Sequence, residues 1–187
     1  MRLTTRPLDP STWDDFVELM DRNNGVFGGC WCIGFHTPPG FPADNRAAKH
    51  ERVLSGTTHS ALVYDQDGVV QGWCQYGTPV ELPRIKNSRE YAKDLPPHPD
   101  WRIACVFVDP RHRGSGIARA AVAGALEQIA AAGGGLVEAI SEVTAGRKAH
   151  GRFLFSATAE LLESFGFRRI RQVGKHAWIL HGMVEAG

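Results

Sequence analysis

One stretch near the middle of the chain restricts its fold more than any other. An apolar run from Ile103 to Val108 is followed by a turn with two glycines and then by an alanine-rich segment from about Gly116. Three consecutive glycines at 133–135 end that segment, and a second apolar run extends from Leu136 to Ile140. A strand, a helix and a strand joined by a short crossover predict a parallel strand pair within one sheet.

The segments on either side predict the rest of the sheet and its helices. A capping-box-like start at Ser11 precedes an amphipathic pattern, and a hairpin pattern with an Asp-Gly turn lies between positions 59 and 76. We expect strands at 1–8, 59–64, 69–76, 103–108, 136–140, 167–173 and 177–180, and helices at 9–23, 43–54, 116–132 and along the stripe Leu154 to Phe165. These elements predict a single domain, residues 1–187, of the α/β (α+β) class with a mixed sheet.

Composition excludes several classes of protein. Of the 187 residues, 43% are hydrophobic and 22% charged, with a formal net charge of +1, which is typical of a globular domain and disfavours disorder. A near-neutral chain does not hold nucleic acid by neutralising phosphates. The N-terminus has no apolar core of signal-peptide length, and no apolar run is long enough to cross a bilayer. We therefore expect a cytoplasmic protein without nucleic-acid or membrane partners.

Four cysteines are too few for a disulfide scaffold in a chain of this length. Cys74 and Cys105 lie in strand-like runs, so we expect four reduced thiols, two of them in the core. Cys30, Cys32 and His36 offer an alternative, a zinc site. Because a second close pair of ligands is lacking, we expect no bound metal.

The turn after Val108 has the character of an anion site. A helix N-terminus presents free N–H groups, and glycines let a phosphate approach the backbone closely. Two known phosphate-binding patterns are excluded. A Walker loop needs Lys after its last glycine, where Ile117 stands, and a dinucleotide fingerprint needs Gly or Ala at the position of Arg119.

The remaining pattern, Arg111-x-x-Gly114-x-Gly116, resembles the Arg/Gln-x-x-Gly-x-Gly/Ala signature of the GNAT N-acetyltransferases. Phe165-Gly166-Phe167 resembles the closing Gly-Phe of that family, and the order of elements fits over nearly the whole chain. Cys30-Trp31-Cys32 and Trp101-Arg102-Ile103 are similar to a sparsely characterised bacterial subgroup. The resemblance implies a splayed parallel strand pair that holds acetyl-CoA as cosubstrate.

The resemblance also implies which residues bind the cosubstrate. The amides that hold its pyrophosphate are those of Arg113, Gly114, Ser115, Gly116, Ile117 and Ala118. The side chains of Arg111 and Arg113 add positive charge, or are simply solvated. The strand with Val106, Phe107 and Val108 pairs with the pantetheine arm, and one N–H near Val106 polarises the thioester carbonyl.

The implied reaction is direct attack of a primary amine on the thioester, for which the ammonium group must first lose a proton. Glu138 is our candidate base, with Glu142, Glu81 and the histidines His36, His112 and His150 as further candidates. Many family members have a tyrosine, as acid for the thiolate, where this chain has Leu162. Ser156 or a water replaces it, or the thiolate leaves unassisted.

Several alternatives stay open at this point. The acceptor pocket is expected between the loop 24–41 and the segment 78–100, where Phe27, Trp31, Phe35 and Phe41 form either its wall or a separate apolar cluster. The acceptor is a small molecule or a protein amino group, and the chain a monomer or a homodimer. Because Leu162 cannot donate a proton, a catalytically silent acyl-CoA-binding sensor is an alternative function. A small zinc-stabilised interaction domain around Cys30 is another.

Overall fold

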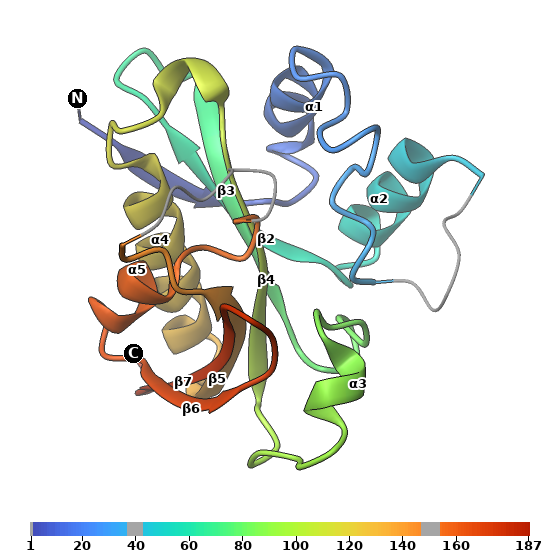
Figure 1. Ribbon diagram of the computed structural model, residues 1–187. Coiled ribbons are helices and arrows are strands. Elements are labelled where there is room, and N and C mark those ends of the chain that lie inside the picture. The colour runs from blue at the N-terminus through green and yellow to red at the C-terminus, as the bar shows by residue number, and fades with distance from the viewer. Residues whose placement is uncertain (1, 37–42, 147–153) are drawn as a thin grey trace.

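A mixed seven-stranded sheet forms the centre of the computed structural model, which describes residues 2–36, 43–146 and 154–187 (Figure 1). Its spatial order is β1-β2-β3-β4-β5-β7-β6. The strands are β1 (Thr4–Pro7), β2 (His59–Tyr64), β3 (Val70–Gly77), β4 (Trp101–Val108), β5 (Gly135–Glu142), β6 (Arg168–Gln172) and β7 (Ala177–Val184). The helices are α1 (Trp13–Asp21), α2 (Asn45–Leu54), α3 (Ser88–Tyr91), α4 (Ile117–Ala131) and α5 (Ala159–Glu163), with the 3-10 turn η1 (Pro110–His112).

The predicted parallel pair is β4 and β5, and it separates after a short contact. The two strands pair only where Trp101–Ile103 faces Val137–Ala139. The register between β3 and β4 shifts at Ala104, which has no partner in β3. An extra residue of this kind bends its strand, so β4 follows β3 and leaves β5 beyond that point. The expected splay, and with it the mixed α/β class, is confirmed.

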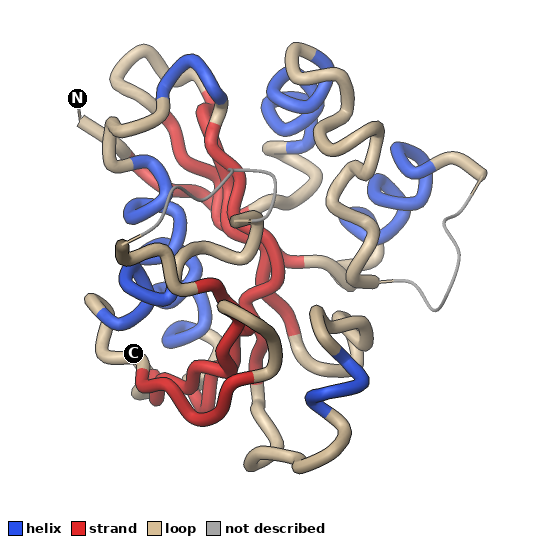
Figure 2. Tube along the Cα trace, in the orientation of Figure 1, coloured by secondary structure: helices blue, strands red, loops and turns tan. Residues whose placement is uncertain are grey.

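Helices cover the sheet on both faces, as Figure 2 shows. One apolar cluster joins α4 and α5 to the sheet through residues such as Val122, Ile129 and Leu162. A second cluster joins α1 and α2 to the other face through Phe16, Trp73 and their neighbours. No helix among the described residues is long and apolar enough to cross a membrane.

Helix α4 approaches the edge strand β1 closely. A Cβ atom on Gly124 would lie 2.8 Å from Cβ of Thr5, so only glycine permits this approach. The helical spacing predicts one apolar face with Val122, Ala125, Leu126 and Ile129. Three of these residues are fully buried, and Leu126 is partly buried against the same cluster.

Two local predictions are wrong. The helix expected from Leu154 to Phe165 is helical only over Ala159–Glu163, because the hydroxyl of Thr158 caps it and the preceding residues cross the splay instead. The capping box expected at Ser11 does not form. The hydroxyl of Ser11 donates to Asp9, and α1 begins after Thr12 without a side-chain cap.

Candidate functional site

The glycine turn after β4 presents free backbone donors. Gly114 and Gly116 have φ angles of 80° and 82°, a conformation that strains any residue with a Cβ. Gly116 is the N-cap of α4 and offers no side chain to the first N–H groups of the helix. Those groups, together with the positive end of the helix dipole, favour an anion at this place.

A groove of about 660 Å³ runs from this turn along β4. Most of the residues expected to bind the cosubstrate line it: Val106, Phe107, Val108, Arg113, Gly114, Gly116, Ile117 and Ala118. Arg111 and Ser115 do not line the groove, although Ser115 lies in the same turn. The far wall comes from Leu154, Phe155, Ala157, Thr158 and Leu161.

The buried carboxylate of Asp109 stabilises the glycine turn through hydrogen bonds. It accepts hydrogen bonds from the guanidinium groups of Arg111 and Arg22, at 2.6 Å and 3.1 Å, and one from the amide of Asn23 at 3.3 Å. The Arg111 guanidinium is the main cause that holds the pKa of Asp109 well below its usual range. Arg111 therefore supports the turn through Asp109, although its side chain is largely exposed, and its contact with phosphates stays a prediction.

One expected donor is engaged elsewhere. The N–H of Val106 donates to the carbonyl of Phe155, which crosses the splay between β4 and β5. The ring of Phe155 lies near those of Phe27 and Phe35, with centroids 6.3 Å and 5.9 Å away. An acyl oxygen that takes this N–H must displace the Phe155 carbonyl.

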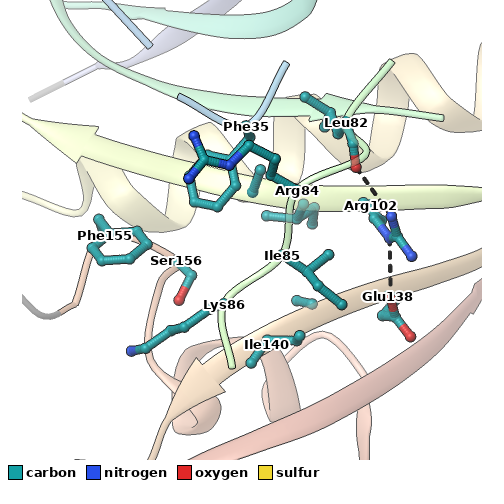
Figure 3. A pocket seen from close by; sticks show the side chains of 13 residues that line it. Phe35, Leu82, Arg84, Ile85, Lys86, Arg102, Glu138, Ile140, Phe155 and Ser156 are labelled. Carbon is teal, nitrogen blue, oxygen red and sulfur yellow. Dashed lines mark hydrogen bonds and ion pairs between the residues drawn. The ribbon is translucent and has the colours of Figure 1, made fainter. Parts of the chain in front are cut away.

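The splay opens into a narrow cavity of about 20 Å³, room for a single water molecule. Figure 3 shows Arg102 and Glu138 at one end of it and Phe155 and Ser156 at the other. Glu138, the only acidic residue that lines it within the described part of the chain, is almost fully buried. Its oxygens accept from Arg102 Nε at 3.2 Å and Tyr91 Oη at 2.9 Å, and contact His181 Nε2 at 3.1 Å.

The hydroxyl of Ser156 is the unusual group of this cavity. Ser156 is buried, and its Oγ has no hydrogen-bond partner among the described residues. Its backbone carbonyl accepts from the Ser141 hydroxyl at 2.7 Å, which fixes the residue in place. A buried hydroxyl without a partner is costly, so a ligand atom that bonds with it would be favoured.

A second cavity, of about 290 Å³, adjoins both the groove and the narrow cavity. The two segments expected to form the acceptor pocket meet here. Val26, Phe27, Cys30, Cys32, Gly34 and Phe35 come from the first and Arg84, Ile85 and Lys86 from the second. Trp31 instead packs with Trp13 and Phe16 in the apolar cluster, and Phe41 lies outside the described residues.

The other candidate bases lie apart from these cavities or have partners. Glu142 forms an ion pair with Lys86 at 2.6 Å, and Glu81 one with His59 at 3.3 Å. His112 ends η1 next to the glycine turn. His150 lies outside the described residues.

Cys32 and His36, two of the three residues of the alternative zinc site, have other partners. The Cys32 thiol donates to Gln75 Oε1 at 3.1 Å. His36 donates from Nδ1 to the carbonyl of Glu81, and its Nε2 lies 2.8 Å from the amide nitrogen of Gln75. In the described residues no group of three His, Cys, Asp or Glu side chains is arranged to hold a metal. The zinc-stabilised domain therefore has no support in this geometry.

His36 belongs to a buried chain of hydrogen bonds that ends on a lysine. Lys49 is fully buried and donates to the Thr58 hydroxyl at 2.7 Å, and that hydroxyl lies 2.9 Å from His36 Nε2. Thr58 already accepts from Lys49, so it donates to His36 and keeps Nε2 an acceptor. Burial, with the nearby charge of Lys49, lowers the pKa of His36 to about 3. Burial also lowers the pKa of Lys49.

A family model described as the acetyltransferase (GNAT) family matches residues 31–154. The chain belongs to this family. The match begins at Trp31 and includes both splayed strands and the glycine turn. The fold and the acyltransferase class expected from Arg111-x-x-Gly114-x-Gly116 are therefore confirmed.

Solved structures of GNAT proteins share the fold of this chain at low sequence identity. A histone acetyltransferase HPA2 and related acetyltransferase from Corynebacterium glutamicum is 16% identical, with a TM-score of 0.56 and coverage of 97% of this chain and 96% of that one. A phosphinothricin acetyltransferase from Sinorhizobium meliloti, solved with acetyl-CoA, is 15% identical, with a TM-score of 0.56 and coverage of 100% and 91%. NAA60 of Arabidopsis thaliana, also solved with acetyl-CoA, is 16% identical, with a TM-score of 0.52 and coverage of 98% and 100%. No curated protein matches significantly.

Sequence reasoning missed three residues of this GNAT site. Asp109 carries a local signal, since Asp before Pro is typical of a turn start, and its carboxylate indeed accepts from the N–H of Arg111. Phe155 was assigned to a helix, and Arg84 lies in a proline-rich segment without periodicity. Both acquire their positions only from tertiary contacts.

Proposed function

We propose that this GNAT protein is an acetyl-CoA-dependent N-acetyltransferase that transfers the acetyl group to a primary amine. The observation that carries the proposal is the continuity of the site. The groove of about 660 Å³ connects an anion-binding turn to the splay, and a cavity with Glu138 and Ser156 lies at its inner end. The acetyl-CoA in two of the solved GNAT structures supports the same cosubstrate here.

The residues fit the parts of acetyl-CoA by their chemistry. The open space beyond Gly114 and Gly116 admits a diphosphate to the amides, and Arg113 adds positive charge. The apolar wall of Val106, Phe107 and Val108 suits the pantetheine arm, whose thioester then lies near the splay.

In the proposed reaction the amine nitrogen bonds to the acetyl carbon and the carbon–sulfur bond breaks. The proton of the attacking ammonium passes to Glu138, the carboxylate of the narrow cavity. The departing sulfur takes a proton from Ser156, whose hydroxyl lacks a partner among the described residues. The bonded nitrogen loses its second proton to solvent, from which Ser156 recovers the proton that it gave to the sulfur. Glu138 passes its own proton to a water in the narrow cavity, which has room for one such molecule.

A silent acyl-CoA sensor is the second candidate. Leu162, at the position of the usual tyrosine, is fully buried in the apolar cluster and supplies no proton. The N–H of Val106 is also bonded to Phe155. A sensor would bind acetyl-CoA and leave the thioester intact.

Two measurements test the proposal against this alternative. Acetyl-CoA is expected to raise the melting temperature by several degrees, because it binds only the native state. A panel of primary amines is then expected to release free CoA thiol in proportion to acetylated amine. A thermal shift without thiol release would identify a sensor, and absence of both would refute the proposal.

Substitution of Glu138 is expected to impair removal of the ammonium proton, and substitution of Ser156 to impair protonation of the departing sulfur. Glu138→Gln should lower kcat at pH 7 by about a hundredfold or more, and Ser156→Ala by about tenfold. The Glu138→Gln defect should shrink as the pH approaches the pKa of the acceptor ammonium, since less of the amine then needs a base. The Ser156→Ala defect should not shrink in this way. A pH-independent Glu138→Gln defect, with acetyl-CoA still raising the melting temperature, would assign Glu138 a structural role.

A further inference from the structure

The cavity of about 290 Å³ has an unbalanced charge. Its charged lining residues are Arg84 and Lys86, and no Asp or Glu lines it within the described part of the chain. An amine enters such a cavity against a positive field unless it also carries a negative group.

Of the two positive side chains, Lys86 has a carboxylate partner, whereas Arg84 has none among the described residues. Lys86 is paired with Glu142 at 2.6 Å, and the neighbouring Arg102 with Glu138 at 3.2 Å. Arg84 is half-buried, and none of the described carboxylates forms an ion pair with it. A guanidinium held in a cavity without a counter-ion is suited to a planar anion such as a carboxylate, which it binds through two parallel hydrogen bonds.

The backbone holds Arg84 in place at the cavity rim. Its N–H donates to the carbonyl of Phe35 at 3.2 Å, which joins the two walls of the cavity. Figure 3 shows Arg84, Ile85 and Lys86 following one another along the edge of the narrow cavity. Arg84 borders both cavities, so an anion bound there lies beside the entrance to Glu138.

The remaining walls are apolar and largely aromatic. Phe27, Phe35, Trp73 and Phe155 contribute rings, and Val26 and Ile85 contribute aliphatic surface. The volume of about 290 Å³ suits a small molecule rather than a folded partner.

We propose that the acceptor is a small amine with an apolar, ring-bearing body and a carboxylate, and that Arg84 selects it by binding the carboxylate. The proposal rests on the proposed function for the role of the amine. The amine points toward Glu138 while the carboxylate stays at Arg84, so opposite ends of a zwitterion meet opposite charges. Polyamines and lysine-rich protein segments, which bring only positive charge, are poor acceptors.

Two pairs of probes that differ only in the carboxylate test this. Calorimetry in the presence of saturating CoA compares N-acetyl-L-phenylalanine with N-acetylphenethylamine, the products of the two corresponding amines. We expect the carboxylate to improve the dissociation constant at least tenfold, as a charge-assisted pair does. L-Phenylalanine should exceed phenethylamine by a similar factor in kcat/KM for thiol release, mainly through KM.

Variants of Arg84 show whether this residue makes the distinction. Arg84→Gln should bind the two acetylated probes equally, and Arg84→Lys should keep part of the preference. Arg89→Gln, which removes the same charge from an exposed position in α3, should keep all of it. These variants should not alter the thermal shift produced by acetyl-CoA.

Equal binding of the two probes to the unmodified protein, or binding of neither, would overturn the inference. So would a preference that survives in Arg84→Gln. If acetyl-CoA binds and amines are acetylated without such a preference, the proposed function stands and this inference alone fails. If the carboxylate probe binds selectively but no amine is acetylated, the carboxylate site at Arg84 stands, and the proposed function fails together with the role of this ligand as acceptor.

Discussion

Replacement of Gly114 by glutamate is expected to abolish binding of acetyl-CoA. The new carboxylate would stand where the proposed site holds a diphosphate, and like charges about 4 Å apart repel by several kcal/mol near a protein surface. A Cβ at Gly114 meets no atom within 4 Å, so the substitution causes no clash at that atom. We expect the dissociation constant for acetyl-CoA to rise at least a hundredfold and the thermal shift to disappear.

Gly114→Gln is the matched control, because it has the same size and the same backbone strain. A residue with a Cβ at a φ of 80° costs about 1–2 kcal/mol, and this cost is common to both variants. The glutamine variant should lose less than about tenfold in affinity for acetyl-CoA, since it brings no negative charge to the turn. Equal affinities of the two variants for acetyl-CoA would show that no phosphate lies at this turn.

Acidification is expected to destabilise the protein through His36. Its pKa is about 3 in the folded state and near 6.5 when unfolded, so between these values only the unfolded chain takes up the proton. The stabilising contribution is therefore complete above pH 6.5 and is lost as the pH falls. Between pH 6 and 4 we expect a loss of about 1.4 kcal/mol per pH unit from this group, measured by urea unfolding.

The hydrogen bonds around His36 explain why its imidazole stays neutral in the folded protein. A proton on Nε2 would face the amide nitrogen of Gln75 at 2.8 Å and the hydroxyl of Thr58, with Lys49 bonded to that hydroxyl. His36→Gln should flatten the dependence of stability on pH, at some cost in stability at pH 7. His98→Gln, at an exposed position outside this network, should leave the dependence unchanged. A slope that persists in His36→Gln would assign the acid sensitivity to other groups.

The features that could be predicted from the sequence are those whose causes are local. The glycine turn depends on two residues with positive φ and on the helix that follows, and all of these are contiguous. The apolar face of α4 repeats at helical spacing, which places Val122, Ala125, Leu126 and Ile129 on one side of the helix, and all four pack in the α4 cluster. The same local rule failed at Leu154 to Ala157, where contacts across the splay outweigh the helical pattern.

The roles of polar residues depended on contacts distant in sequence. Glu138 was a candidate base by its place on a strand, but its bonds to Arg102, Tyr91 and His181 join four separate segments. His36 was a candidate ligand or base, and only its burial beside Lys49 reveals a neutral structural group. Such assignments require the fold, because a sequence does not state which charge a side chain meets.

The two apolar clusters on opposite faces of the sheet have a consequence for how this protein can diverge. Along β4, Val106 packs with the α4 cluster while Cys105 and Phe107 pack with the α1 cluster. None of residues 26–35 or 84–86 belongs to the α4 cluster, so substitutions there leave the packing of Ile117 at the start of α4 intact. The side chains that these two segments contribute to the cavity of about 290 Å³ can therefore vary while the helix after the glycine turn keeps its packing.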